Sequence, residues 1–270
     1  MRATNLYGRP GLAASLTLAL LCAGCANVTV PARAPDAVRA QPATDTATVE
    51  IARSSRRSEG EPLAPYWEAF RIPLKPATEY RYVNTDSGGA LEARAERSAS
   101  ALQRVVDIDP AMHSVVEWRW RVDQTVDGAD KRYADSEDSP ARLIVAFEGD
   151  HGKLDFEERA MMRLAKTLTG REMPYATLMY VWSNLHPPET LLPSPRTSRV
   201  QMIVVEGGAD RVGRWGNFRR DIAADFRRAF GEEPGRITAV GVMTDADNTQ
   251  KSGRCLYGDI TFRALDSPQI

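Results

Sequence analysis

The chain has 270 residues, of which 43% are hydrophobic, and its 35 basic and 36 acidic side chains give a formal net charge of −1. This apolar content is high enough for a folded core, which excludes a wholly disordered protein. Nucleic-acid-binding proteins usually carry a basic excess or stripe, and this charge balance lacks one, so we expect no nucleic-acid partner.

The N-terminus has the pattern of a secretory signal. Arg2 and Arg9 precede an uncharged apolar run that is too short to cross a bilayer, since a membrane-spanning helix needs about 20 apolar residues. The sequence Leu-Cys-Ala-Gly-Cys ending at Cys25 resembles the lipobox of bacterial lipoproteins, except that Cys22 stands where an aliphatic residue is usual. We therefore expect residues 1–24 to be a lipoprotein signal peptide and Cys25 to carry the lipid. An ordinary cleaved signal peptide is the alternative.

The segment that follows is predicted to be a tether. Residues 25–60 are rich in Ala, Pro, Thr, Arg and Ser and have no sustained apolar period, which is typical of a disordered linker. Ala26 follows the predicted lipidated cysteine in place of Asp, and the resemblance to sorted lipoproteins then implies an anchor in the outer membrane, facing the periplasm. After processing, Cys255 would be a lone cysteine, and we expect a buried thiol there rather than a disulfide.

Residues 61–266 are predicted to form one domain, because segments with a two-residue hydrophobic period dominate them. In Val115–Val122, for example, Val116, Trp118 and Trp120 share one face while charged residues occupy the other. The predicted strands are Glu79–Asn84, Leu91–Arg97, Ala101–Asp107, Val115–Val122, Arg142–Glu148, Thr177–Trp182, Arg199–Glu206, Arg236–Thr244 and Leu256–Ala264, and the predicted helices are Phe156–Leu168 and Asp221–Phe230. Many strands and two short helices predict a mainly β fold, a two-sheet antiparallel sandwich that is jelly-roll-like.

Ordered motifs along this domain resemble a known family. They are Asp138-Ser-Pro-Ala-Arg142 before an apolar strand, Tyr180-Val-Trp182, Arg220-Asp221 with Asp225, Phe230-Gly-Glu-Glu-Pro234, Thr244-Asp-Ala-Asp-Asn-Thr249 and Tyr257-Gly-Asp-Ile-Thr-Phe262. Together they resemble the domain of unknown function 3047 over nearly all of residues 61–265. The resemblance implies a secreted sandwich domain in outline. It implies no activity, because none is established for that family.

The loop Asp245–Thr249 is the most distinctive polar segment. It lies between two predicted strands, where binding loops commonly occur, and Asp245, Asp247 and Asn248 offer it carboxylate and amide groups. Three interpretations stay open: an Asx-rich turn that bonds its own backbone, a contact to sugar hydroxyls or another ligand, and a structural calcium site. The EF-hand pattern is not met, since Gln250 stands where that loop has Gly. We expect no other cofactor.

Aromatic and charged side chains provide further candidates for a ligand surface. Trp118 and Trp120 lie two residues apart on one strand face, a spacing that suits either a platform for sugar rings or a packed core, and Trp182 presents the same choice. The charged candidates, at predicted strand or helix starts, are Asp138, Arg142, Arg199 and Asp221. These would either pair with one another or bind an anionic or polyhydroxylated ligand. Asp221 has the further alternative of a helix-terminal role.

No complete catalytic motif is present in the sequence, which lacks a Gly-x-Ser-x-Gly elbow, a His-Glu-x-x-His pair and a phosphate-binding loop. We therefore predict a lipid-anchored sandwich that binds a glycan or a related cell-envelope ligand. A glycan hydrolase or lyase that uses paired carboxylates is one alternative. An envelope interaction protein without a small ligand is the other.

Overall fold

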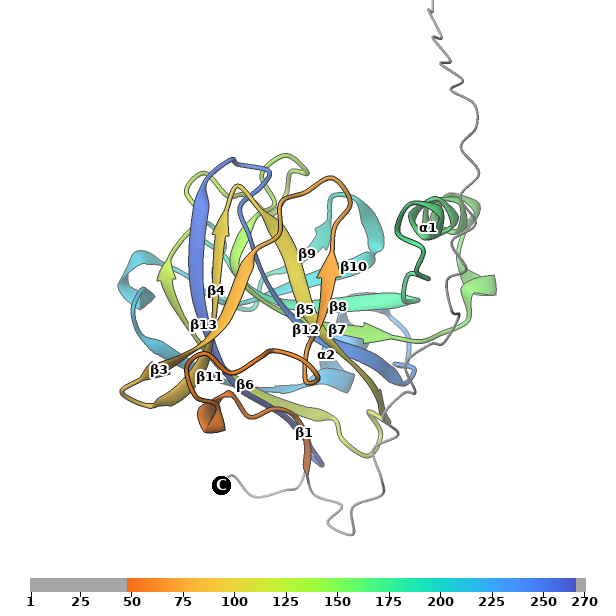
Figure 1. Ribbon diagram of the computed structural model, residues 1–270. Coiled ribbons are helices and arrows are strands. Elements are labelled where there is room, and N and C mark those ends of the chain that lie inside the picture. Colours follow the sequence, from red (N-terminus) through yellow and green to blue (C-terminus); the bar gives the residue numbers. More distant parts are fainter. Residues whose placement is uncertain (1–47, 266–270) are drawn as a thin grey trace, which may run out of the picture. The chain divides into compact units, whose positions relative to one another are not determined.

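The computed structural model describes residues 48–265, apart from the side chains of two residues in one helix. The predicted signal peptide, the predicted lipid-bearing Cys25 and the part of the predicted tether before residue 48 lie outside the described residues. Within them, the chain folds into two packed β-sheets, called sheet A and sheet B below (Figure 1).

Sheet A has the strand order β11-β6-β13-β4-β3, and β1 also pairs with β13. Its strands are β1 (Thr48–Ala52), β3 (Glu79–Thr85), β4 (Gly88–Glu96), β6 (Val115–Gln124), β11 (Trp215–Asp221) and β13 (Ser252–Arg263). Each pairing in this sheet is antiparallel. Because β13 pairs with β1, β4 and β6, it forms the centre of the sheet.

Sheet B has the strand order β2-β5-β12-β7-β8-β10-β9. Its strands are β2 (Glu68–Arg71), β5 (Ala99–Ile108), β7 (Ser139–Phe147), β8 (Ala176–Trp182), β9 (Leu191–Ser194), β10 (Thr197–Glu206) and β12 (Ile237–Asp245). The prediction of a mainly β, two-sheet sandwich is confirmed. One pair departs from the antiparallel pattern: β10 runs parallel to β8, because the edge strand β9 first carries the chain back along the sheet.

The predicted tether extends too far along the chain. Its last part contains β1 and the short 3₁₀ helix η1 (Ser54–Arg56), so the folded domain begins before residue 61. In the β1–β13 pair Thr48 faces Arg263, and the side chain of Ile51 is 1% exposed. The apolar residues of β1 are too few to stand out from the polar composition around them. Pairing with a strand about 200 residues away in the chain orders the segment nonetheless.

The core between the two sheets explains the two-residue period of the sequence. In β6 the residues Val116, Trp118, Trp120 and Val122 are buried, while the charged residues between them are partly exposed. Alternation places one face of each strand in the core and the other toward solvent. Packing of these apolar faces, which is the dominant favourable contribution to folding, therefore holds the sandwich together.

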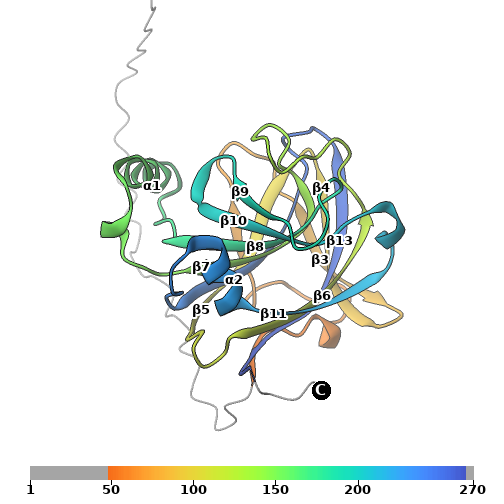
Figure 2. The ribbon, with the colours of Figure 1, turned by 180° about the vertical axis from the view of Figure 1, so that it is seen from behind.

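Two helices begin and end within one residue of the predicted bounds. In α1 (Phe156–Thr169) the Asp155 side chain accepts a hydrogen bond from the Glu158 backbone N–H, and α2 (Ile222–Phe230) ends at Gly231 with a left-handed φ of 72°. Both views show α1 on the sheet B side of the sandwich (Figure 1, Figure 2). Two further 3₁₀ turns are η2 (His151–Lys153) and η3 (Ala209–Arg211). None of the helices in residues 48–265 is long and apolar enough to cross a membrane.

Candidate ligand-binding site

The three tryptophans predicted to contact ligand are buried in the core. Trp118, Trp120 and Trp182 are 4%, 0% and 0% exposed. The ring of Trp118 lies 5.8 Å from that of Trp120 and 4.8 Å from that of Tyr180, and Trp120 donates its indole N–H to Glu206 at 2.8 Å. A ring enclosed by protein on both faces cannot stack on a sugar. The packed-core alternative is therefore correct for these residues, and the platform hypothesis is wrong.

Arg199 and Asp221 lie apart from the other charged candidates and have structural partners. Arg199 on β10 donates to the Glu232 carboxylate at 2.8 Å and to the Tyr175 carbonyl at 3.0 Å. Asp221 precedes α2 and accepts a hydrogen bond from the Ala224 backbone N–H at 3.0 Å. Its charge also interacts favourably with the helix dipole. Neither residue joins the site described below.

The remaining charged candidates converge where β7 begins and β12 ends. Asp138, Arg142, Asp245 and Asp247, together with Lys131, form what we call the charged cluster, and each is at most 6% exposed. Arg142 donates from Nε and Nη2 to the two carboxylate oxygens of Asp245, at 2.8 and 2.9 Å. Burial disfavours the charged guanidinium, but attraction to Asp245 outweighs it and raises the pKa of Arg142. This bidentate ion pair fixes the end of β12 against the start of β7.

Asp138 holds the predicted ligand loop in place through four hydrogen bonds. Its Oδ1 accepts from the backbone N–H and the side-chain amide of Asn248, at 3.2 and 3.0 Å. Its Oδ2 accepts from the backbone N–H and the hydroxyl of Thr249, both at 2.7 Å. These donors occupy most of the carboxylate's acceptor capacity. Asp138 and the amide of Asn248 therefore stabilise the conformation of the loop rather than face a ligand.

Two lysines lie against the carboxylates of the charged cluster. Lys131 is 1% exposed and donates to the Asp138 backbone carbonyl at 2.5 Å. Burial, followed by repulsion from Arg142, lowers the pKa of the Lys131 ammonium to about 7. Lys75, on the segment that leads into β3, forms an ion pair with Asp247 at 2.5 Å. Arg142 and Lys75 are thus the cations that pair with carboxylates of the cluster.

Three carboxylates of the charged cluster are close enough to share a metal ion. One oxygen from each of Asp138, Asp245 and Asp247 lies within 4.8 Å of the others. Calcium takes about six to eight oxygen ligands, and such a set supplies part of them. However, the same carboxylates already accept hydrogen bonds or ion pairs from Arg142, Lys75 and the loop. This donor set suits a salt-bridge network better than a calcium site.

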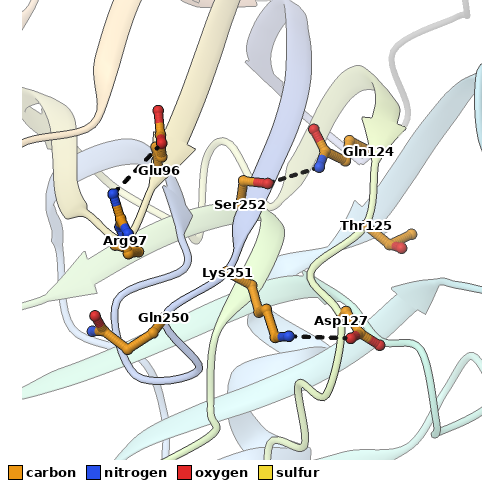
Figure 3. Close-up of a pocket in the computed structure, with 8 residues that line it drawn as sticks. All are labelled: Glu96, Arg97, Gln124, Thr125, Asp127, Gln250, Lys251 and Ser252. Atoms are coloured by element: carbon orange, nitrogen blue, oxygen red, sulfur yellow. Dashed lines mark hydrogen bonds and ion pairs between the residues drawn. The ribbon is translucent and has the colours of Figure 1, made fainter.

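The loop that carries Asp247 continues into a polar cleft of about 310 Å³ (Figure 3). Three separate segments form its walls: the β4–β5 turn, the end of β6 with the residues after it, and the start of β13 with the residues before it. The lining residues are Glu96, Arg97, Gln124, Thr125, Asp127, Gln250, Lys251 and Ser252. Figure 3 shows Lys251 directed toward Asp127, at 3.6 Å, and Gln124 bonded to Ser252, at 2.8 Å.

The backbone of the cleft is held in an unusual conformation. Arg97 and Gln250 have left-handed φ values of 47° and 58°, which residues other than glycine adopt uncommonly. The Arg97 N–H donates to the Lys251 carbonyl at 2.8 Å, and the Ser98 carbonyl accepts from the Ala246 N–H at 3.0 Å. These bonds tie the β4–β5 turn to the loop after β12. Backbone conformations of this kind persist where the surrounding structure fixes them, often at functional sites.

Comparison with known proteins places the chain in a family. The profile described as protein of unknown function (DUF3047) matches residues 65–261, which is most of the chain and nearly the whole sandwich. The chain is a member of the DUF3047 family. The resemblance noted in the sequence is therefore confirmed. A comparison with curated proteins yields no match.

Solved structures similar to this DUF3047 protein include carbohydrate-binding modules. A family 11 module of a cellulosomal cellulase of Clostridium thermocellum is 11% identical, with a TM-score of 0.38, and covers 76% of this chain and 91% of its own. A family 11 module from the same organism, in complex with a β-1,3-1,4-mixed-linked tetrasaccharide, is 11% identical, with a TM-score of 0.40. The match covers 81% of this chain and 96% of the module. The glycoside hydrolase domain of Endo-D from Streptococcus pneumoniae is 8% identical, with a TM-score of 0.35. The match covers 76% of this chain and 23% of that structure's chain. The fold assignment made above rests on the strand pairing of the chain itself.

Sequence reasoning identified the charged cluster but missed the cleft. Asp138, Arg142, Asp245, Asp247 and Asn248 do lie together, although their polar partners are other groups of the protein, and Lys131 of the cluster was not a candidate. None of the residues that line the cleft was a candidate. They come from three distant turns, and each alone reads as an ordinary polar turn residue. Proximity to the loop after Asp245 was the one signal that pointed toward Gln250 and Lys251.

Proposed function

We propose that this domain binds a glycan or a related cell-envelope ligand in the polar cleft. One observation carries the proposal: side-chain amides, hydroxyls, carboxylates and cations surround a single space of about 310 Å³. Backbone hydrogen bonds between the β4–β5 turn and the loop after β12 hold these groups in place. A polyhydroxylated ligand presents both donors and acceptors. Gln124 and Gln250 offer both kinds of group, and the hydroxyls of Thr125 and Ser252 do the same.

Binding suits this cleft better than hydrolysis. A glycosidase needs an acid whose pKa is raised, commonly by burial, beside a second carboxylate. The two carboxylates of the cleft, Glu96 and Asp127, are 82% and 88% exposed. Each also lies near a cation, Arg97 at 3.8 Å and Lys251 at 3.6 Å. We therefore favour recognition without cleavage.

The ligand test is a glycan array with soluble protein spanning residues 26–270, followed by calorimetry with the glycan that binds. Lys251→Ala and Gln250→Ala should weaken binding about tenfold or more, because each removes a polar contact in the cleft. Lys166→Ala on α1 is a matched control, since Lys166 is also exposed and lies outside the cleft. The absence of any binding glycan, or unchanged affinity of both cleft variants, would contradict the proposal. Mass spectrometry of the incubated glycan reports cleavage, which would support the hydrolase or lyase alternative.

We further propose that Cys25 carries a lipid and that the protein is held in the outer membrane, facing the periplasm. The lipobox-like sequence and Ala26 support this proposal. Two or more acyl chains would anchor the protein stably, whereas a single chain does not. Cys25→Ser should leave unprocessed precursor and abolish incorporation of labelled fatty acid. Normal processing and release of the variant, or recovery of the wild type with inner membranes, would contradict the anchor or its location respectively.

A further inference from the structure

Arg104 occupies an inward-facing position of β5. It lies opposite Val240 of β12, a core residue that is 0% exposed. Its neighbours on the same strand face, Leu102 and Val106, also pack into the core. Arg104 therefore brings a guanidinium to a position where the strand pattern predicts an apolar side chain.

No carboxylate compensates this charge within residues 48–265. Nη1 of Arg104 donates to the backbone carbonyls of Glu50 and Ile51 in β1, and its side chain forms no ion pair with a described acidic residue. Burial lowers the pKa of Arg104, since desolvation disfavours the charged form. A guanidinium has five N–H donors, so this one keeps donors for an anion.

A cavity of about 150 Å³ opens beside this guanidinium. The aromatic residues of its wall are Tyr66, Trp67 and Tyr82, of which Tyr66 is 43% exposed. The guanidinium of Arg57, another wall residue, lies 3.5 Å from the centre of the Tyr66 ring. The buried Nε of Arg53, also in the wall, has no hydrogen-bond partner among the described residues. Aromatic rings and the guanidinium groups of Arg53, Arg57 and Arg104 thus surround one space. Its one wall carboxylate, Glu50, is paired with Arg53.

We propose that this cavity binds a carboxylate attached to a six-membered ring. The planar fork of Arg104 matches the two oxygens of a carboxylate, and the aromatic side chains of Tyr66, Trp67 and Tyr82 in the wall suit contact with a ring. A cavity of roughly 150 Å³ is large enough for one ring of benzene size. A sugar acid and an apolar ring acid share this chemistry. The cavity and the polar cleft have no lining residue in common, so the inference does not rest on the proposed function.

The test compares four probes by calorimetry at constant pH and ionic strength: sodium glucuronate, sodium cyclohexanecarboxylate, glucose and sodium acetate. At least one of the two carboxylated rings should bind ten times or more tightly than both glucose, which lacks the charge, and acetate, which lacks the ring. Tighter binding of glucuronate identifies a sugar acid, and tighter binding of cyclohexanecarboxylate identifies an apolar ring acid. Equal or weaker binding of both carboxylated rings relative to glucose overturns the proposal.

Two variants assign the binding to the cavity. Arg104→Met keeps the apolar stem and removes the charge, and it should weaken binding of the carboxylated ring at least tenfold. Arg104→Lys keeps the charge without the planar fork and should give an intermediate loss. Lys166→Ala, on α1 and outside both the cavity and the polar cleft, should bind the carboxylated ring as the wild type does. Unchanged affinity of Arg104→Met overturns the proposal.

Tyr66→Ala keeps the test decisive if Arg104→Met does not fold. Tyr66 is partly exposed, so its removal leaves the core in place while it takes away one face of the cavity. Affinity for the carboxylated ring should fall at least fivefold. Affinity equal to that of the wild type would show that the ring does not lie in this cavity.

Discussion

Asp138 shows how one buried carboxylate organises a loop. It is 0% exposed and accepts four hydrogen bonds from Asn248 and Thr249. In Asp138→Asn an amide donor replaces one acceptor oxygen and faces these N–H groups. Since each buried donor without an acceptor costs about 1–3 kcal/mol, the free energy of unfolding should fall by about 2–4 kcal/mol. Urea unfolding measures this, with the exposed Asp135→Asn as control. Equal stability of the two variants would show that the bonds do not hold the loop.

Lys131 makes the stability of the domain depend on pH. Its pKa is lowered to about 7 in the folded protein from a usual 10.5, so the unfolded chain binds the extra proton between these values. The contribution of Lys131 to stability should therefore rise between pH 7 and 10, by up to about 1.4 kcal/mol for each pH unit. Lys131→Met lacks this gain. In urea titrations the difference in unfolding free energy between the two proteins should therefore shift in favour of the wild type as pH rises across this window, whereas the exposed Lys153→Met should parallel the wild type.

The ammonium of Lys75 neutralises the carboxylate of Asp247, which a calcium ion would otherwise do. Because the ammonium already pairs with that carboxylate, 1 mM Ca²⁺ or EDTA should change the melting temperature of the wild type by less than about 1 °C. Lys75→Met leaves Asp247 without its cation, so calcium should stabilise this variant more than the wild type. Thermal melts of both proteins give the answer. A calcium-dependent rise of several degrees in the wild type would instead identify a structural metal site.

Single residues also show where the sequence was informative about the site. A period of two with a Trp at every second position fits a core and a platform equally, and only the second sheet packed over Trp118 and Trp120 decides between them. Pairing among the charged candidates was one of two open alternatives for Arg142, but its actual partner, Asp245, had been considered only as part of the polar loop. Arg104 gave no signal, because one Arg within a strand is ordinarily a solvent-facing residue.

At the scale of the elements, η1 packs closely against β4, and Gly89 permits it. A Cβ atom at Gly89 would lie 2.2 Å from the Arg57 carbonyl oxygen and 2.4 Å from that of Ser54. Gly89→Ala must therefore displace the segment after η1, and overpacking of this kind costs about 1–3 kcal/mol. Gly152→Ala is the control, because its new Cβ would meet only the Asp150 side chain. Unfolding free energies of the two variants should differ. Equal values would mean that the segment moves aside without cost.

The elements that the sequence predicted share one property. Each of the nine predicted strands carries enough apolar or alternating residues to be recognised alone, and each overlaps a strand of the structure. The strands that were missed are β1, β2, β9 and β11. Of these, β2 and β9 have four residues each and lie at the two edges of sheet B. In β11, Trp-Gly-Asn-Phe-Arg-Arg-Asp lacks alternation, and pairing with β6 rather than its own pattern makes it a strand.

At the scale of the whole molecule, the described sandwich depends on its core rather than on covalent cross-links. Cys255 is the single cysteine among residues 48–265, and its thiol is 0% exposed. Burial raises the pKa of that thiol well above its usual value, which keeps it protonated and unreactive. The prediction of a buried thiol is confirmed. The two candidate binding spaces are thus carried by a scaffold whose order comes from packing and from ion pairs such as Arg142–Asp245.

The pairing of the first described strand with the last has a mechanical consequence. In the β1–β13 ladder Thr48 faces Arg263 and Ala52 faces Ile260, so the two outward chain directions leave from the same end of the ladder. A force applied between residues 48 and 263 should therefore unzip the hydrogen bonds one after another. A force applied between residues 48 and 252 should shear them together, because β13 is then pulled from its opposite end. Optical-tweezers measurements should show β1 detaching at a lower force in the first geometry, and equal rupture forces would refute this account of how the domain yields to load.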